Sequence, residues 1–137
     1  MRAQIFTAEQ QSELTRWAQE LRTTALQQGN RRLRSEYGFC CLGIYCHLVN
    51  PTGWSPQKSV GEFFVVYQYR EAQYPKEFYT TLPDSFRQAL GLSTLLQDAF
   101  IRLNDGFRYT FTQIADEIIA LVNTGTFTEP TVRCLGL

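Results

Sequence analysis

The chain has 137 residues, of which 44% are hydrophobic and 19% are charged. This is an ordinary globular composition, and it excludes intrinsically disordered, collagen-like and low-complexity proteins. Thirteen Lys and Arg residues balance thirteen Asp and Glu residues, so no net charge attracts the chain to bulk nucleic acid or to an anionic membrane. The length predicts a single domain over residues 1–137.

The first predicted helix begins at Thr7, because Thr7 and Gln10 have the spacing of a capping box. Apolar residues then recur at helical spacing until Gly29, which is the expected C-cap. These apolar residues are Leu14, Trp17, Ala18, Leu21 and Ala25. The pattern predicts an amphipathic helix whose Gln, Glu, Arg and Thr residues face solvent.

Between Asn30 and Tyr37 three arginines lie close to one leucine, and this pattern fits a short strand or turn. Residues Phe39–Val49 are apolar on nearly every side. They are therefore predicted to form a central helix that other elements cover, ending at Asn50-Pro51-Thr52-Gly53.

The strongest strand signal is Phe63–Arg70, which is rich in β-branched and aromatic residues. We expect a turn at Tyr74-Pro75-Lys76 and a returning strand over Phe78–Thr81. The two strands would form an antiparallel hairpin.

Three further helices follow in the pattern. The first starts near Pro83 and stops at Gly91, the second covers Leu95–Leu103, and the third begins at a capping box on Thr110. The buried stripe of the third is Phe111, Ile114, Ala115, Ile118 and Val122. An edge strand is expected around Phe127. The whole pattern predicts an α+β fold, in which several helices surround a central apolar helix beside a small antiparallel sheet.

The residues at the N-terminus contain no apolar stretch of signal-peptide length, and the longest apolar runs, Phe63–Tyr67 and Ile118–Val122, are too short to span a bilayer. We therefore expect a cytoplasmic protein with no membrane partner. The four cysteines are then expected to stay reduced.

Cys40, Cys41, Cys46 and His47 raise the question of a zinc site, since thiolate and imidazole are zinc ligands. At about 100° per residue on a helix the three cysteines point in different directions, so they cannot meet at one ion. His47 lies roughly 10 Å along the axis from Cys40, beyond hydrogen-bond reach. We therefore predict no metal, no cofactor and no catalytic residue, and interpret the cysteines as buried hydrophobes. An acid–base pair of Asp, Glu or Tyr stays open.

One candidate binding surface remains, because arginine forks hold phosphates and aromatic rings stack on bases. Three arginines cluster in the predicted turn, and tyrosines recur on the predicted sheet at Tyr67, Tyr69, Tyr74 and Tyr79. Strand alternation would place Arg32 and Arg34 on the same side. The predicted ligand-binding residues are Arg31, Arg32, Arg34, Tyr67, Tyr69, Asn104 and Asp105. The alternative is a solvated basic turn beside a half-buried sheet.

Several blocks of the chain are distinctive together: Arg32-Leu33-Arg34, YGFCCLGIYCHL at 37–48, Leu82-Pro83, Leu90-Gly91-Leu92, and LNDG followed by FTQIADEI within 103–118. With these blocks the chain resembles a family of short phage and prophage proteins, over roughly residues 20–122. Where that family's pattern is expected to have an acidic residue after the third cysteine, this chain has His47.

The resemblance implies a small α+β protein of the host cytoplasm made during phage infection, and it establishes no activity. Small accessory phage proteins are often counter-defence factors, so the leading hypothesis is a protein that sequesters a nucleotide-derived immune signalling molecule without turnover. Two alternatives stay open. One is an inhibitor that docks directly on a host defence protein through the exposed hairpin, and the other is a nucleotide-cleaving enzyme that uses Asp105 and tyrosines. The aromatic hairpin edge also leaves homo-oligomerisation open.

Overall fold

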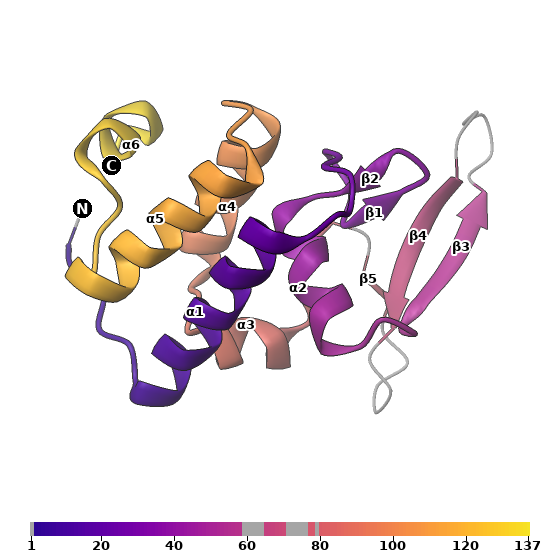
Figure 1. Cartoon of the computed structure of the whole chain (residues 1–137), viewed down its shortest axis with the longest axis horizontal. Coiled ribbons are helices and arrows are strands. Elements are labelled where there is room, and N and C mark those ends of the chain that lie inside the picture. The colour runs from indigo at the N-terminus through magenta and orange to yellow at the C-terminus, as the bar shows by residue number, and fades with distance from the viewer. Residues whose placement is uncertain (1, 59–64, 71–76, 79) are drawn as a thin grey trace.

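Helices build one end of the molecule and a small sheet builds the other (Figure 1). The computed structural model describes residues 2–58, 65–70, 77–78 and 80–137. Within these residues the helices are α1 (Ala8–Thr23), α2 (Cys41–Val49), α3 (Asp84–Leu90), α4 (Thr94–Asp105), α5 (Phe111–Thr124) and α6 (Glu129–Leu135). The strands are β1 (Arg34–Ser35), β2 (Gly38–Phe39), β3 (Trp54–Lys58), β4 (Val65–Arg70) and β5 (Glu77–Phe78). The predicted α+β class is confirmed.

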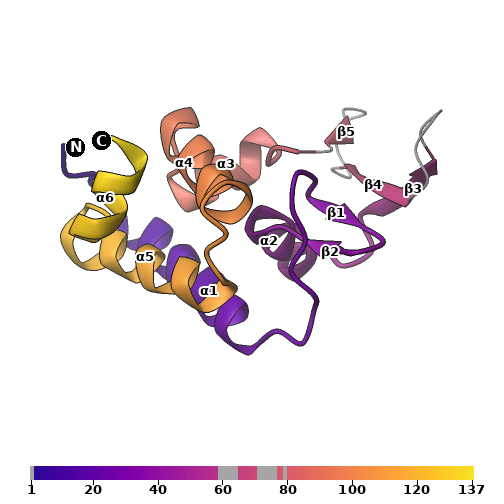
Figure 2. The ribbon, with the colours of Figure 1, turned by 90° about the horizontal axis from the view of Figure 1, so that it is seen from above.

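Helices α1 and α5 lie side by side and antiparallel, so the end of α1 and the start of α5 are at the same end of the pair (Figures 1 and 2). Both predicted capping boxes are present, with the side chain of Thr7 accepting from the Gln10 N–H and that of Thr110 from the Gln113 N–H. Both helices therefore begin where the sequence predicts.

The first helix ends at Thr23, well before the predicted C-cap at Gly29. The residues beyond it pair with the chain near β2 instead. The Phe39 N–H donates to the carbonyl oxygen of Gln27 at 2.9 Å, and the Gly29 N–H donates to the carbonyl oxygen of Phe39 at 2.7 Å. A contact between distant parts of the chain has thus replaced the last helical turn, which makes the predicted end of this helix wrong.

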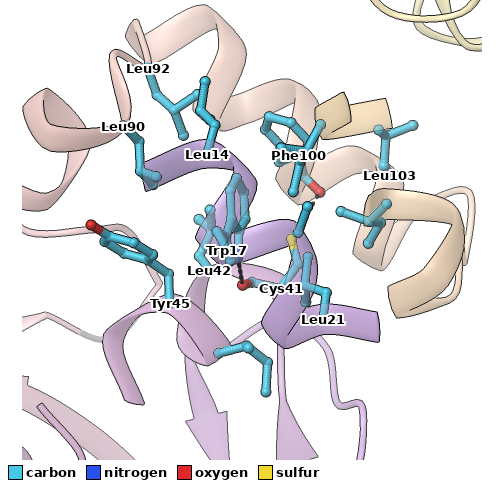
Figure 3. Packing of buried hydrophobic residues seen from close by; sticks show 14 of the residues in the cluster. Leu14, Trp17, Leu21, Cys41, Leu42, Tyr45, Leu90, Leu92, Phe100 and Leu103 are labelled. Carbon is cyan, nitrogen blue, oxygen red and sulfur yellow. Dashed lines mark hydrogen bonds between the residues drawn. The ribbon is translucent and has the colours of Figure 1, made fainter. Parts of the chain in front are cut away.

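The apolar helix α2 lies between the other helices and the sheet (Figure 2). It begins at Cys41 rather than Phe39, because Gly38 and Phe39 form β2. The indole N–H of Trp17 donates to the carbonyl oxygen of Cys41 at 2.9 Å, which fixes α1 against the start of α2 (Figure 3). The ring of Trp17 also packs edge-on against Phe100 of α4, with ring centroids 5.0 Å apart. One buried hydrophobic cluster therefore joins α1, α2 and α4.

The sheet has the strand order β2-β1-β4-β3, with β5 also paired to β4, and the described pairs are antiparallel. The predicted strand Phe63–Arg70 is present over Val65–Arg70, and its hairpin partner on the C-terminal side is β5. The sequence did not indicate β3, whose Trp54 faces Tyr69 in the register. The predicted turn at Tyr74-Pro75-Lys76 lies outside the described residues.

The predicted edge strand around Phe127 is wrong, because residues 125–128 form no strand and α6 begins directly after them, at Glu129. Phe127 is buried against Phe100, with ring centroids 5.4 Å apart. The buried carboxylate of Glu117 on α5 accepts from the backbone N–H of Thr128 at 2.8 Å and from its hydroxyl at 2.8 Å. An acceptor from a neighbouring helix therefore holds the start of α6, and local sequence does not reveal such a contact.

None of the described helices is both long and apolar enough to cross a membrane.

Candidate functional site

An open cleft of about 1050 Å³ lies between the connection that follows α1 and the connection from α4 to α5. Residues 27–32 and 35–37 line it on the first side, and Asn104 with residues 108–110 line it on the second. Its volume is at the upper end of ordinary small-ligand pockets, which span about 300–1,000 Å³. We call it the arginine cleft, because Arg31, Arg32 and Arg108 line it.

The two sides of the arginine cleft are joined by Gln28. Its side-chain amide N–H₂ donates to the carbonyl oxygen of Tyr109 at 2.8 Å and to Oδ1 of Asn104 at 2.9 Å. Its side-chain oxygen accepts from the Phe111 N–H, the first amide of α5, at 3.1 Å. One side chain therefore fixes the spacing between the two connections.

Asn104, a predicted ligand contact, belongs to the floor of the cleft and is only 4% exposed. Its Oδ1 also accepts from the Cys41 N–H at 3.1 Å, and its Nδ2 donates to the carbonyl oxygen of Gly29 at 2.9 Å and to Oδ1 of Asp105 at 2.9 Å. These bonds, with the one from Gln28, use both ends of the amide. In this structure the hydrogen bonds of Asn104 therefore hold the two sides of the cleft together. Asp105, the other predicted ligand contact in this segment, accepts a hydrogen bond from Asn104.

Two of the cleft arginines have an unusual backbone. Within the described parts of the chain, Arg31 (φ 65°) and Arg108 (φ 56°) are the non-glycine residues with positive φ. The left-handed conformation costs an L-residue roughly 1–2 kcal/mol. Such residues are enriched at ligand-binding positions, where the surrounding structure holds them.

No described residue holds the guanidinium group of either of these two arginines. Across residues 2–58, 65–70, 77–78 and 80–137, neither Arg31 nor Arg108 has a side-chain ion pair, hydrogen bond or ring contact. Arg22, by contrast, pairs with Asp116 at 2.8 Å. Arg31 and Arg108 therefore present positive charge to the cleft that the described residues leave uncompensated.

Arg34 lies outside the arginine cleft. Its guanidinium stacks over three rings, with the central carbon 4.0 Å from the ring centroid of Tyr67, 4.9 Å from Phe39 and 5.6 Å from Trp54. The expectation that Arg32 and Arg34 share one face of a strand is wrong, because β1 begins only at Arg34. The structure thus separates Arg34 from Arg31 and Arg32.

The predicted tyrosines also lie away from the cleft. Tyr69 is 1% exposed, and its ring packs against Trp54 and Phe86, with centroid distances of 4.9 and 5.6 Å. Tyr67 is half-buried under Arg34. The further tyrosines on the predicted sheet, Tyr74 and Tyr79, lie outside the described residues.

Sequence reasoning missed two residues of the cleft, Tyr37 and Arg108. Tyr37 is 64% exposed and is the aromatic residue beside the arginines on the first side. Arg108 is an isolated arginine three residues after the end of α4, so no local cluster marked it. Its place beside Arg31 follows from tertiary structure alone.

His47 is held in a neutral form beside the stacked Arg34. The indole N–H of Trp54 donates to Nδ1 of His47 at 3.1 Å, which requires this nitrogen to be unprotonated. Partial burial lowers the pKa of His47 below its usual 6.5, and the nearby charge of Arg34 lowers it further, while Glu20 acts in the opposite direction. Protonation of His47 would therefore break the contact between α2 and β3.

We expect acidification to destabilise the protein through His47. Because its pKa is lower in the folded than in the unfolded chain, the unfolded chain binds more protons below pH 6.5. The contribution to stability is complete above pH 6.5 and is lost as the pH falls below that value. Urea unfolding at about pH 7.5 and about pH 5.5 measures this difference.

The matched variant is His47→Phe, which removes the chain's single histidine. Its unfolding free energy should change less between the two pH values than that of the wild type. Parallel pH dependence of the two proteins would contradict the assignment.

The three buried cysteines, Cys40, Cys41 and Cys46, are neutral thiols. Burial raises the pKa of Cys40 to about 12 and raises the pKa values of Cys41 and Cys46 well above the usual 9.0. Nucleophilic attack and metal ligation both need the thiolate. All four cysteines are free, and Cys134 alone of the four is exposed. The described residues contain no group of three His, Cys, Asp or Glu side chains placed to hold a metal ion.

A family model described as Domain of unknown function (DUF8296) matches residues 10–122. No curated protein and no solved structure matches the chain. The matched range includes both sides of the arginine cleft.

Proposed function

We propose that this chain, which belongs to the DUF8296 family, binds a nucleotide-derived signalling molecule in the arginine cleft and sequesters it without turnover. The observation that carries the proposal is the pair Arg31 and Arg108. Both residues hold a strained backbone and line the same cleft, and neither has an ionic partner among the described residues. An anionic ligand would supply that partner.

The chemistry of the cleft favours a phosphorylated ligand that carries a base. Guanidinium groups bind phosphate oxygens through two parallel hydrogen bonds. The exposed ring of Tyr37 offers a surface for base stacking, which is worth about 1–3 kcal/mol per base. The carboxylate of Glu36 lines the same side and can accept from a base amino group.

Binding without turnover is supported by what lines the cleft. Among its described lining residues there is no histidine or cysteine, and Glu36 is the carboxylate among them. The groups that could carry a proton there are thus Glu36, Tyr37 and Tyr109, without the imidazole that most often serves as general base. The resemblance to phage proteins extends the proposal to counter-defence, in which a host immune signal is withdrawn from its receptor.

We expect Arg31→Ala and Arg108→Ala each to weaken ligand binding about tenfold to a hundredfold, because a hydrogen bond to a charged group contributes about 1.5–3 kcal/mol. Lysine at either position should restore binding only in part, since the planar fork is lost. The matched control is Arg133→Ala on α6, because the side chain of this arginine is 72% exposed and lies 3.8 Å from Glu129, outside the cleft. Isothermal titration calorimetry with a nucleotide panel measures the affinities.

The same preparation tests turnover. The protein is incubated with the nucleotide extract of phage-infected bacteria, washed on a filter and heated, and the released molecules are identified by mass spectrometry. Intact ligand supports sequestration, and a cleaved product supports the enzyme alternative. Full binding by the folded Arg31→Ala/Arg108→Ala double variant would remove the arginine cleft as the site.

A further inference from the structure

Resting on the proposed function, we infer that Glu36 is the specificity-determining residue of the arginine cleft, and that the base of the bound nucleotide is guanine. The carboxylate of Glu36 accepts two hydrogen bonds from the edge of the guanine, and the neighbouring ring of Tyr37 stacks on its face. Arg31 and Arg108 hold the phosphate, as in the proposed function.

Glu36 and Tyr37 are neighbours at the tip of one hairpin. The register pairs Ser35 of β1 with Gly38 of β2, so Glu36 and Tyr37 are the two residues that join these strands. Both line the arginine cleft, and Tyr37 is 64% exposed. The hydroxyl oxygen of Ser35 accepts from the Tyr37 N–H at 3.1 Å, which holds the turn. One short turn therefore presents a carboxylate and an aromatic ring to the same cleft.

The hairpin is fixed against the segment that carries Arg31. The Phe39 N–H donates to the carbonyl oxygen of Gln27 at 2.9 Å, and the Gly29 N–H donates to the carbonyl oxygen of Phe39 at 2.7 Å. A Cβ added to Gly38 would lie 2.5 Å from the same Gln27 oxygen, so the two backbones are in direct contact. Because Arg31 follows two residues after Gly29, the hairpin tip is held in place relative to the arginine before any ligand binds.

The carboxylate of Glu36 has no partner in the part of the chain that the structure describes. Although Arg31, Arg32 and Arg108 line the same cleft, Glu36 forms no ion pair or hydrogen bond with them or with another described residue. A carboxylate accepts hydrogen bonds, donates none and repels a phosphate. It therefore suits the end of the ligand that offers N–H groups, which in a nucleotide is the base.

Among the common bases, guanine matches a carboxylate best. Its N1–H and its 2-amino group are adjacent donors on one edge, so both carboxylate oxygens can accept in parallel. Adenine and cytosine each offer one amino group beside an acceptor nitrogen that repels the carboxylate, and uracil offers one N–H between two carbonyl oxygens. A site built to make such hydrogen bonds rejects a base that lacks the donors, because the carboxylate is then left unpaired.

The test is calorimetric titration with 5′-monophosphates, 5′-triphosphates and 3′,5′-linked dinucleotides, each form prepared with guanine, hypoxanthine, adenine, cytosine and uracil. Within the form that binds most tightly, the guanine nucleotide should bind about tenfold or more tightly than those of adenine, cytosine and uracil. The hypoxanthine nucleotide lacks only the 2-amino group, so its affinity should lie between those of guanine and adenine.

Glu36→Gln replaces two acceptors by one acceptor and one donor. It should weaken binding of the guanine nucleotide about tenfold and remove the preference for guanine over adenine, whose amino group and ring nitrogen can pair with a carboxamide. A purely structural role for Glu36 would lower the affinity for every base alike and would leave the preference unchanged.

The matched control is Glu129→Gln on α6, because the side chain of Glu129 is 82% exposed and lies outside the cleft. Neither affinity nor base preference should change in this variant. Tyr37→Ala should weaken the binding of all bases, whereas Tyr37→Phe should retain the stacking and the preference for guanine. Thermal unfolding of each variant confirms that the affinities come from folded protein.

The other outcomes separate the two proposals. Equal binding of the five bases, preference for a base other than guanine, or a guanine preference that survives Glu36→Gln overturns this inference. The proposed function then stands if Arg31→Ala and Arg108→Ala weaken binding. Absence of binding by every probe, or binding that neither arginine substitution changes, overturns the proposed function, and the inference with it.

Discussion

Replacing Gly43 with alanine should destabilise the protein by about 3 kcal/mol or more. A Cβ at this position of α2 would overlap the carbonyl oxygen of Leu33 and lie 2.7 Å from its carbonyl carbon. The Leu33 carbonyl cannot withdraw easily, because it accepts from the Cys40 N–H at 3.1 Å and the Leu33 side chain is fully buried. The helix and the arginine-bearing connection must therefore separate to admit one methyl group.

Helix propensity alone predicts the opposite sign, because in a helix alanine is more favourable than glycine by about 1 kcal/mol. A loss of stability in Gly43→Ala would therefore come from the clash with Leu33. Urea unfolding monitored by Trp fluorescence gives the change in unfolding free energy. Val49→Ala, at an exposed position near the end of the same helix, is the control and should change stability by about 0.5 kcal/mol or less. A Gly43→Ala protein as stable as the wild type would contradict the close contact between α2 and the Leu33 carbonyl.

Asn104→Ala should also cost about 3 kcal/mol or more. The substitution removes the partner of the buried Cys41 N–H and of the part-buried Gly29 carbonyl, and a buried polar group left unpaired costs about 1–3 kcal/mol. It also removes a buried side chain from the end of α4, which adds the cost of a cavity. It also removes the hydrogen bond from the Gln28 side chain to Asn104, which helps to fix the spacing between the two sides of the arginine cleft. Ligand affinity should therefore fall even at temperatures where the variant stays folded.

The control for Asn104→Ala is Asp98→Ala, at an exposed position of the same helix α4. Unfolding free energies from urea titration should leave Asp98→Ala within about 0.5 kcal/mol of the wild type. If the two variants lose the same small amount of stability, Asn104 is not the floor of the cleft.

Much of the helical framework could be predicted because its signals are local. The capping boxes at Thr7 and Thr110 begin α1 and α5. The predicted stripe of α5 is buried from Phe111 to Ile118, but Leu121 is buried at its end and the predicted Val122 is only partly buried. The errors arise where a distant partner decides the structure. Gly29 does not cap a helix, because its N–H donates to the carbonyl oxygen of Phe39 in β2. At the C-terminal end, Glu117 of α5 accepts from the N–H of Thr128 and so holds the start of α6. Pattern reasoning on one segment at a time cannot see such pairings.

The site could be predicted only in part for the same reason. The sequence indicates Arg31 and Arg32 because they are neighbours, and it groups Arg34 with them although the Arg34 guanidinium stacks on three aromatic rings in the structure. Arg108 and Tyr37 join the site through folding alone. A cluster in the sequence therefore indicated the right region, and the tertiary structure decided which of its members face the cleft.

Because three cysteines are buried and one is exposed, the rate at which a thiol reagent labels the natural cysteines reports unfolding of the chain. A thiol reagent can reach Cys134 in the folded protein, whereas Cys40, Cys41 and Cys46 are enclosed around α2. One cysteine should thus be labelled at the rate of a free thiol, and the other three only when α2 opens. The number of labels per chain therefore measures the fraction of molecules in which α2 has opened, and no engineered probe is needed. Ligand in the arginine cleft should slow the three late labels, because binding favours the closed state by mass action.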